Sequence, residues 1–440
     1  MRVRAALSGV FLWGGGLALT MLFAFLLAQR GRPGPVTNPT DFRAFYCAGS
    51  AVLARADPYR VEPLRGCEAS VLAHAGLHWI PGLVVPAPLP PWDLALFSLF
   101  ATMPFLVASS LWFALAIVAW FRMVMLLHEL TGLRIVWPAL ATLGLGLFAS
   151  LTYGQLMPLS MWLVVEIAAA LHAGAERRAA LLAIAGTIEP QIGGPVALAL
   201  FALRPGTRPM LALGAGALLA VSLVTLAPEQ CLEWFSQVLP AQANSDLRNA
   251  EQFSLTSVLV AAGTAPATAR VLGVLDYAVM VVLGIWTAAR IDVRWREPAV
   301  IALLPAAFAV FGGPYVHQHH LAAALPMALL AFARTRRPEF AAAAVLLSWP
   351  WLSQAELIPQ LHEAFWRTHA VTLPDVRPDD LAETTWANFI GPYAPQGRAI
   401  LIATLVKLPL WLGVALVVVP LVRLAAAGDL RRYGEAQRAR

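Results

Sequence analysis

Apolar runs long enough to cross a lipid bilayer, separated by short basic stretches, decide what this chain can fold into. Such runs recur from residue 5 to residue 425. A membrane-spanning helix needs about 20 apolar residues because the hydrocarbon core is about 30 Å thick. Hydrophobic residues make up 59% of the 440 residues and charged residues only 13%, which leaves too little polar surface for a soluble protein of this length. The sequence therefore predicts an all-α, polytopic membrane protein.

The apolar runs predict about twelve membrane segments, all in a single domain over residues 1–440. Two of them are short helices that form a hairpin between Arg178 and Arg204, with "EPQIGGP" at the turn. The others are expected at residues 5–29, 104–127, 135–151, 156–173, 209–227, 270–289, 297–313, 321–334, 338–353 and 398–425. The stretch from Pro90 to Pro104 is too short to span, and we expect it to lie in the membrane interface.

Arginines set the expected orientation, since cytoplasmic loops carry an excess of basic residues. With Pro90 to Pro104 in the interface, both termini and the loops at residues 177–178, 290–297 and 334–338 face the cytosol of a bacterial inner membrane. The loops that face outward include a first loop at 30–103 and a last loop at 354–397. The net charge of +6 reflects these scattered arginines, so we expect contact with membrane lipids and no nucleic acid.

The first outward loop contains the polar stretch "TNPTDFRAFYCAGSAVLARADPYR". A helix is expected from residue 42, with an apolar side that includes Tyr46 and a basic side with Arg43 and Arg55. Asp41 has two interpretations: it caps this helix, or it is a general base at the membrane surface. Cys47 and Cys67 lie in the same loop, and an exported loop makes a disulfide between them possible.

Three histidines near the outer end of a membrane segment form a second cluster, in the stretch "PYVHQHH" with Tyr315, His317, His319 and His320. Zinc is one interpretation, but no cysteine or acidic residue follows closely enough to complete a tetrahedral site. Imidazoles that donate hydrogen bonds to a phosphate suit the pattern better. We therefore expect no metal and no cofactor.

Polar residues inside apolar segments cost free energy in the bilayer unless they are paired or face water. Glu189 and Gln191 occupy the hairpin turn, where broken helices can line a substrate site. Lys407 lies within the last apolar run, and Gln155 follows Gly154 at an outer helix end, where it could contact sugar hydroxyls.

Five stretches, taken in order, resemble glycosyltransferase family 87, a branch of the C-type superfamily that includes mycobacterial polyprenyl-phosphomannose-dependent mannosyltransferases. They are "DFRAFYCAGSAVLARADPY", "PLPPWDLALFSLFATMPFLVASSLW", "YGQLMPL", "AGTIEPQ" and "HQHHLAAALP". The resemblance covers residues 38–330. It departs from the family at Glu189, where the family often has lysine, and at Met157, where it often has asparagine.

The resemblance implies a C-type glycosyltransferase fold and transfer of a sugar, such as mannose, from a polyprenyl-monophosphate donor to a lipid or glycan acceptor on the periplasmic face. It implies Asp41 as the general base, with inversion at the anomeric carbon. It also places His319 and His320 near the donor phosphate, where His317, Arg43, Arg55 and Lys407 are further candidates. Tyr46, Gln155, Glu189, Gln191 and Tyr315 are the expected substrate contacts.

Two other classes fit parts of the pattern. A transporter would explain the broken hairpin and the buried charges, although transporters usually show repeated halves and binding groups near the midplane. A flippase or scaffold for lipid-linked saccharides would explain the outward polar clusters. An Asp41→Asn variant separates these classes, since only the enzyme needs that carboxylate as a base.

Overall fold

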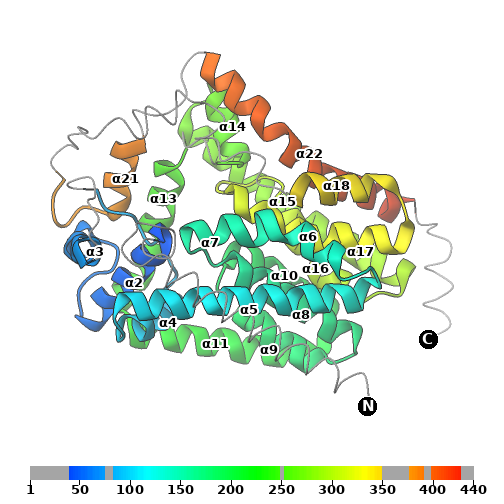
Figure 1. Ribbon diagram of the computed structural model, residues 1–440, viewed down its shortest axis with the longest axis horizontal. Helices are drawn as coiled ribbons and strands as arrows, with labels where there is room; N and C mark the ends of the chain where they lie inside the picture. The colour runs from blue at the N-terminus through cyan, green and yellow to red at the C-terminus, as the bar shows by residue number, and fades with distance from the viewer. Residues whose placement is uncertain (1–38, 75–82, 248–251, 349–375, 391–397, 428–440) are drawn as a thin grey trace.

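The computed structural model describes residues 39–74, 83–247, 252–348, 376–390 and 398–427 (Figure 1). Within these ranges the chain is helical, and its β-type pairings are two isolated bridges, Arg60 with Leu381 and Gln252 with His317. This confirms the all-α fold class. The expected segment at 5–29 and the C-terminal tail lie outside the described residues.

The helical elements in chain order are α2 (Thr40–Leu53), α3 (Val61–His74), α4 (Pro91–Ala101), α5 (Phe105–Thr131), α6 (Val136–Thr142), η1 (Leu143–Phe148), α7 (Ala149–Tyr153), α8 (Met157–His172), α9 (Glu176–Gly186), α10 (Pro190–Leu203), η2 (Pro205–Thr207), α11 (Arg208–Thr225), α12 (Pro228–Glu233), η3 (Trp234–Val238), α13 (Leu239–Ser245), α14 (Leu255–Ala261), α15 (Pro266–Trp295), α16 (Val300–Ala309), η4 (Gln318–Ala324), α17 (Leu325–Thr335), α18 (Pro338–Ser348), α21 (Ala382–Ile390) and α22 (Arg398–Ala426).

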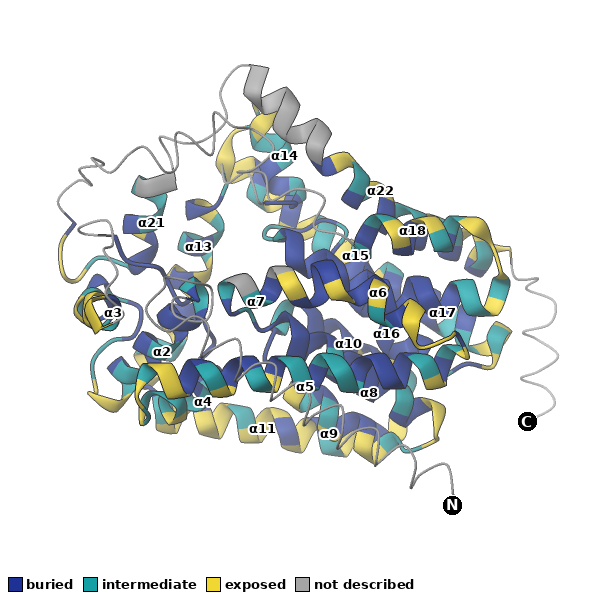
Figure 2. Ribbon diagram, viewed as in Figure 1, coloured by how far each residue is buried: buried dark blue, intermediate teal, exposed yellow. Residues whose placement is uncertain are grey.

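Four described helices are long and apolar enough to cross a membrane by length and composition: Phe105–Thr131, Pro205–Thr225, Pro266–Trp295 and Lys407–Ala426. Several shorter apolar helices pack among them, so the structure agrees with a membrane protein but does not show about twelve spans. Outward-facing side chains of α11 and α15 are large and apolar, for example Val224 and Val282, which suits contact with lipid tails (Figure 2).

The remaining apolar runs are divided because glycine, proline and non-α turns interrupt them. Residues 143–148 form a π-helix that contains two glycines, and Pro305 lies inside α16. All ten residues of α16 are buried, and Figure 2 shows it within the bundle. A short helix can lie at membrane depth when protein surrounds it, because neighbouring helices then satisfy its polar backbone groups.

One end of the helix bundle is held by buried or half-buried ion pairs that join helix termini. Glu297, next to the start of α16, contacts His172 at the end of α8 and Arg334 near the end of α17. Arg204, after α10, pairs with Asp292 near the end of α15 at 2.9 Å. The arginine-rich loops of the sequence therefore gather at one end of the molecule.

The opposite end carries α2, α3, α13 and α21 (Figure 1). A disulfide between Cys47 and Cys67 joins α2 to α3. This is the disulfide that the sequence indicated as possible. The main chain at 59–62 also pairs with residues 378–382, through hydrogen bonds such as that from the Val61 amide to the Asp380 carbonyl at 2.9 Å. Segments from the first and last loops thus form one layer.

Helices α9 and α10 form the expected hairpin. They approach so closely that a Cβ on Gly193 would lie 2.0 Å from the carbonyl oxygen of Gly186. The turn lies against α4, because the indole of Trp92 donates a hydrogen bond to the Thr187 carbonyl at 3.2 Å. The hairpin therefore runs from the arginine-rich end toward the α2–α4 end, and Glu189 lies at its turn.

Candidate active site

A glycine turn places Gln155 against the first turn of α2. Gly154 adopts a left-handed conformation with φ +77°, and its carbonyl accepts a hydrogen bond from the Trp112 indole at 3.0 Å. The Trp112 ring stacks on Phe42, with ring centroids 5.5 Å apart. This packing fixes the turn so that Nε2 of Gln155 donates a hydrogen bond to Oδ2 of Asp41.

Asp41 does not cap α2, so the first of its two interpretations is wrong. Helix α2 begins at Thr40, Pro39 is its N-cap, and Asp41 lies within the first turn. Its carboxylate is oriented by Gln155, a residue 114 positions away in the sequence. A carboxylate at the N-terminus of a helix is also favoured by the helix dipole.

The histidine cluster is built on a short bridge to residue 252 followed by a 3₁₀ turn. Gln252 and His317 form an antiparallel bridge, and η4 begins at Gln318. Side chains three positions apart eclipse in a 3₁₀ helix, so His317 and His320 lie on the same side. The rings of His317 and His319 stack with centroids 5.6 Å apart, and those of His319 and His320 are 4.3 Å apart.

Two of the three imidazoles are held neutral. The backbone amide of His317 donates to Nδ1 of His320 at 2.9 Å, which places any proton of the neutral ring on Nε2. Burial lowers the pKa of His320 to about 3 and holds the pKa of His319 well below its usual value. Nε2 of His319 is buried and has no hydrogen-bond partner among the described residues, so it can accept one from a ligand.

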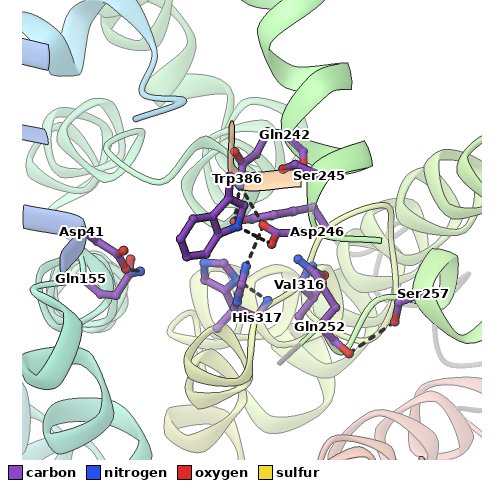
Figure 3. Close-up of polar contacts among 12 residues, drawn as sticks. Asp41, Gln155, Gln242, Ser245, Asp246, Gln252, Ser257, Val316, His317 and Trp386 are labelled. Atoms are coloured by element: carbon purple, nitrogen blue, oxygen red, sulfur yellow. Dashed lines mark hydrogen bonds and ion pairs between the residues drawn. The ribbon is translucent and has the colours of Figure 1, made fainter. Parts of the chain in front are cut away.

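His317 differs because it faces a carboxylate. Its Nε2 lies 3.4 Å from Oδ2 of Asp246, the residue that follows α13 (Figure 3). Gln242 donates to the same oxygen at 2.8 Å, and the indole of Trp386 on α21 donates to Oδ1 at 3.0 Å. The sequence did not identify Asp246, Gln242 or Trp386, since nothing local relates residues 71 and 140 positions apart.

Tyr315 connects this cluster with Asp41. Its ring lies 4.8 Å from that of His317 between centroids, and its hydroxyl accepts a hydrogen bond from Gln242 at 3.0 Å. Burial raises the pKa of Tyr315 first, and the negative charges at Asp246 and Asp41 raise it further. The charge at Asp41 therefore bears on the phenol that packs against His317. Figure 3 shows Asp41 and Gln155 on one side of His317 and Asp246 on the other.

The hairpin turn supplies a third element of the site. The side-chain nitrogen of Gln191 lies 3.4 Å from Nε2 of His320, and the Gln191 carbonyl accepts a hydrogen bond from Tyr277 at 2.7 Å. Glu189 and Asp93 are both buried and are electrostatically coupled. Each has one carboxylate oxygen without a hydrogen-bond partner in the described parts of the chain.

The family model for glycosyltransferase family 87 matches residues 89–314, just over half of the chain. The chain belongs to glycosyltransferase family 87. The matched region of this family 87 protein includes Gln155, Glu189, Gln191 and Asp246, whereas Asp41 precedes it and the histidines follow directly after it. Searches of curated proteins and of solved structures found no match.

The structure describes the surroundings of the two arginines that the sequence offered to a donor phosphate in this family 87 glycosyltransferase. Arg43 is fully buried and pairs with Glu68 of α3 at 3.2 Å, so the side of α2 that carries it packs against α3. Glu68 covers that side, because the disulfide at the neighbouring Cys67 brings α3 against α2. Arg55 lies beyond the last turn of α2, roughly 20 Å along the helix from Asp41.

Lys407 and Tyr46 also make contacts within the protein. The Lys407 ammonium donates to the Gln252 carbonyl and lies 5.4 Å from the centroid of the Phe253 ring. Because Gln252 bridges to His317, Lys407 supports the backbone behind the histidine cluster. The Tyr46 hydroxyl donates to the Met103 carbonyl at 2.9 Å and so ties α2 to the end of α4.

The described residues include no group of three or more histidine, cysteine or acidic side chains that could hold a metal ion. The three imidazoles follow one another around a single turn. One of them, His320, uses a ring nitrogen to accept a backbone amide. The histidines in this part of the chain are thus arranged as separate hydrogen-bonding groups.

Proposed function

We propose that this family 87 glycosyltransferase moves a sugar from a polyprenyl-monophosphate donor to a lipid or glycan acceptor at the outer face of a bacterial inner membrane. The observation that carries the proposal is the Asp41 carboxylate, held by Gln155, on one side of His317 in the close-up of the site (Figure 3). An acid and a set of imidazoles at one end of a bundle of apolar helices suit a substrate whose reactive head lies at the membrane surface.

The distribution of basic residues supports the outward location of the site. Arg204, Arg334 and Glu297 belong to the ion pairs that join helix ends far from the α2–α4 end. The positive-inside rule assigns an arginine-rich end to the cytosol. The end with Asp41 then faces the periplasm, where a lipid-linked sugar replaces the nucleotide sugars of the cytosol as donor.

In the proposed reaction, an acceptor hydroxyl attacks the anomeric carbon in line with the leaving phosphate. The hydroxyl oxygen forms the new C–O bond, and its proton passes to the Asp41 carboxylate. The bond from the anomeric carbon to the phosphate oxygen breaks, and its electron pair leaves with the polyprenyl monophosphate. Configuration inverts in this single displacement. The hydrogen bond from Gln155 orients the base for proton transfer.

The departing phosphate needs hydrogen-bond donors and positive charge at the position where its own charge develops. The histidine cluster can supply both, since His317 faces a carboxylate that favours its protonated form. Nε2 of neutral His320 carries the ring proton and lies beside the Gln191 side chain, 3.4 Å from its nitrogen. The proposed roles of Glu189 and Gln191 are contacts with sugar hydroxyls, because Glu189 keeps an unpartnered carboxylate oxygen among the described residues and Gln191 lies next to His320.

The test uses purified protein in nanodiscs with polyprenyl-monophosphate mannose, glucose or arabinose and a set of membrane-lipid acceptors. We expect transfer from one of these donors, and we expect Asp41→Asn to lower the rate by about 100-fold or more, because general bases contribute about 10²–10⁴-fold. The exposed Asp379 lies at the same end, so Asp379→Asn is the matched control and should keep the wild-type rate. Wild-type transfer by a well-folded Asp41→Asn variant would exclude the assigned base.

A further inference from the structure

We infer that Asp246 is a positioning residue that makes His317 the cationic member of the histidine cluster, and that Trp386 on α21 holds this carboxylate in place. The inference rests on the proposed function, because it assigns a different protonation state to each histidine near the proposed donor phosphate. Asp246 lies within the stretch that the family model matches, but its contacts with His317 and Trp386 come from outside that stretch.

The hydrogen-bond donors around Asp246 indicate an ionised acceptor. Gln242 and Trp386 donate to its two oxygens at 2.8 and 3.0 Å, and the indole nitrogen can act only as a donor. The carboxylate is almost completely buried, with 2% of the residue exposed. A buried carboxylate is stable when donors surround it, and it favours a positive charge on the nearby imidazole.

The two ring nitrogens of His317 explain why a positive charge on this ring would favour binding of a phosphate. Nε2 faces Asp246 at 3.4 Å, so its proton is directed at the carboxylate. Nδ1 can then donate to a phosphate oxygen only when the ring carries both protons. A neutral His317 with its proton on Nε2 would present a lone pair to the phosphate instead. The carboxylate therefore converts His317 from an acceptor into a donor for the leaving group.

The other two histidines cannot take this role. Nδ1 of His320 accepts a backbone amide, which is incompatible with a proton on that nitrogen. His319 is enclosed between the two neighbouring imidazoles, and a second positive charge beside His317 would be repelled. Among the described residues, His317 is the ring of the three with a carboxylate within ion-pair distance, and this asymmetry separates a cationic imidazole from two neutral ones.

Several other titratable groups surround His317 and bear on its protonation. Tyr315, His319 and His320 lie on its own segment, and Glu383 on α21 is electrostatically coupled to Asp246. The charge at Asp41 of α2 helps to raise the pKa of Tyr315, and Lys407 of α22 contacts the Gln252 carbonyl behind the bridge to His317. Of these groups, Asp246 is the one within ion-pair distance of the His317 ring.

The experiment measures binding of undecaprenyl monophosphate, the proposed carrier product, to the full chain in nanodiscs as a function of pH. This ligand carries no sugar, so the result does not depend on the sugar that the enzyme transfers. For the wild type we expect binding that persists above the usual pKa range of histidine. For Asp246→Asn we expect about tenfold weaker binding at neutral pH and a return toward wild-type affinity as the pH falls, because loss of an opposite charge lowers a histidine pKa by about 1–3 units.

The decisive comparison is between His317→Gln and the double variant that combines His317→Gln with Asp246→Asn. His317→Gln should bind weakly at every pH, and adding Asp246→Asn to it should cause no further loss, since the carboxylate acts through that ring. The exposed Asp379→Asn serves as the control and should match the wild type. Trp386→Phe, which keeps an aromatic side chain and removes the N–H donor to Asp246, should shift the pH profile in the same direction as Asp246→Asn by a smaller amount.

The outcomes separate this inference from the proposed function. Equal weakening of Asp246→Asn binding at all pH values, or an additive double variant, would assign Asp246 a structural role and overturn the inference alone. A wild-type chain that transfers sugar but binds no polyprenyl monophosphate would overturn the inference together with the proposed donor class. A pH-dependent loss in Asp246→Asn that the double variant does not deepen supports both.

Discussion

Gly154 and Phe42 approach so closely that a Cβ added to the glycine would lie 2.6 Å from the Cβ of Phe42. The contact presses the turn after α7 against the first turn of α2, and the next residue, Gln155, reaches Asp41 because of it. The position of the proposed base therefore depends on the absence of a side chain 113 positions along the chain, from 41 to 154.

Gly154→Ala should separate the turn from α2 and weaken both stability and transfer. The left-handed conformation costs about 1–2 kcal/mol for alanine, and overpacking adds about 1–3 kcal/mol. Gly174→Ala is the matched control, because Gly174 also has a positive φ, +71°, and nothing lies within 4 Å of its added Cβ. Thermal unfolding in detergent should show the smaller shift for the control, which should also retain full transfer. Equal shifts in both variants would mean that the contact with Phe42 relaxes easily.

The transfer rates of Gln155 variants should depend on how each substitution affects the Asp41 carboxylate. Gln155→Ala removes an orienting donor and should lower transfer by about tenfold, in line with the net worth of a hydrogen bond to a charged group, about 1.5–3 kcal/mol. Gln155→Glu places a second acid beside Asp41, and two neighbouring carboxylates share a proton. The Glu variant should therefore be slower than the Ala variant at neutral pH and should recover as the pH rises. A pH–rate profile of both variants tests this, and a Glu variant without recovery at high pH would contradict it.

The docking of α21 should weaken as the pH rises. Burial raises the pKa of Glu383 from 4.5 to about 8, with the charge at Arg60 opposing this shift and those at Asp246 and Asp57 adding to it. Between these two values the folded chain holds a proton that the unfolded chain has lost, so stability falls across that range. Glu383→Gln, which cannot ionise, should show a smaller drop in unfolding temperature between about pH 5 and about pH 8 than the wild type. An unchanged pH dependence in this variant would show that Glu383 ionises without penalty.

The ion pairs at the arginine-rich end should matter for stability and not for transfer. Glu297 is almost fully buried, whereas its partners His172 and Arg334 are partly exposed, so its removal costs about the worth of a hydrogen bond to a charged group, about 1.5–3 kcal/mol. Glu297→Ala should therefore lower the unfolding temperature markedly, while the protein that remains folded transfers sugar at the wild-type rate. Glu129, which is exposed on α5, provides the control, since surface substitutions change stability by about 0.5 kcal/mol or less. A large loss of rate per folded molecule would indicate coupling between the two ends.

Sequence periodicity predicted the elements whose ends carry local signals. The segment expected at 104–127 corresponds to α5, bounded by Pro104 and Gly132, and the hairpin expected between Arg178 and Arg204 corresponds to α9 and α10. Prolines, glycines and arginines mark such ends directly in the sequence. Where an apolar run is interrupted from within, as at residues 135–151, hydropathy predicted one span and the structure has the shorter pieces α6, η1 and α7.

The partners of charged side chains could not be predicted in this way. Arg43 follows Asp41 in a polar stretch and looks exposed, but Glu68 from a neighbouring helix buries it. Asp246 lies in a loop without a motif, and its role emerges only when α13 and α21 come together beside His317. A single sequence contains the identity of such groups but not the tertiary pairing that decides whether each one binds a substrate or holds the protein together.

The pairing of residues 59–62 with 378–382 means that an early part of the chain finds its partner only in a late part. A ribosome must synthesise more than three hundred residues between these two stretches before the translocon releases the second. Until then Trp386 is missing and the carboxylate of Asp246 lacks one of its donors. The layer that holds Asp246 in place can therefore form only after nearly the whole chain has been synthesised.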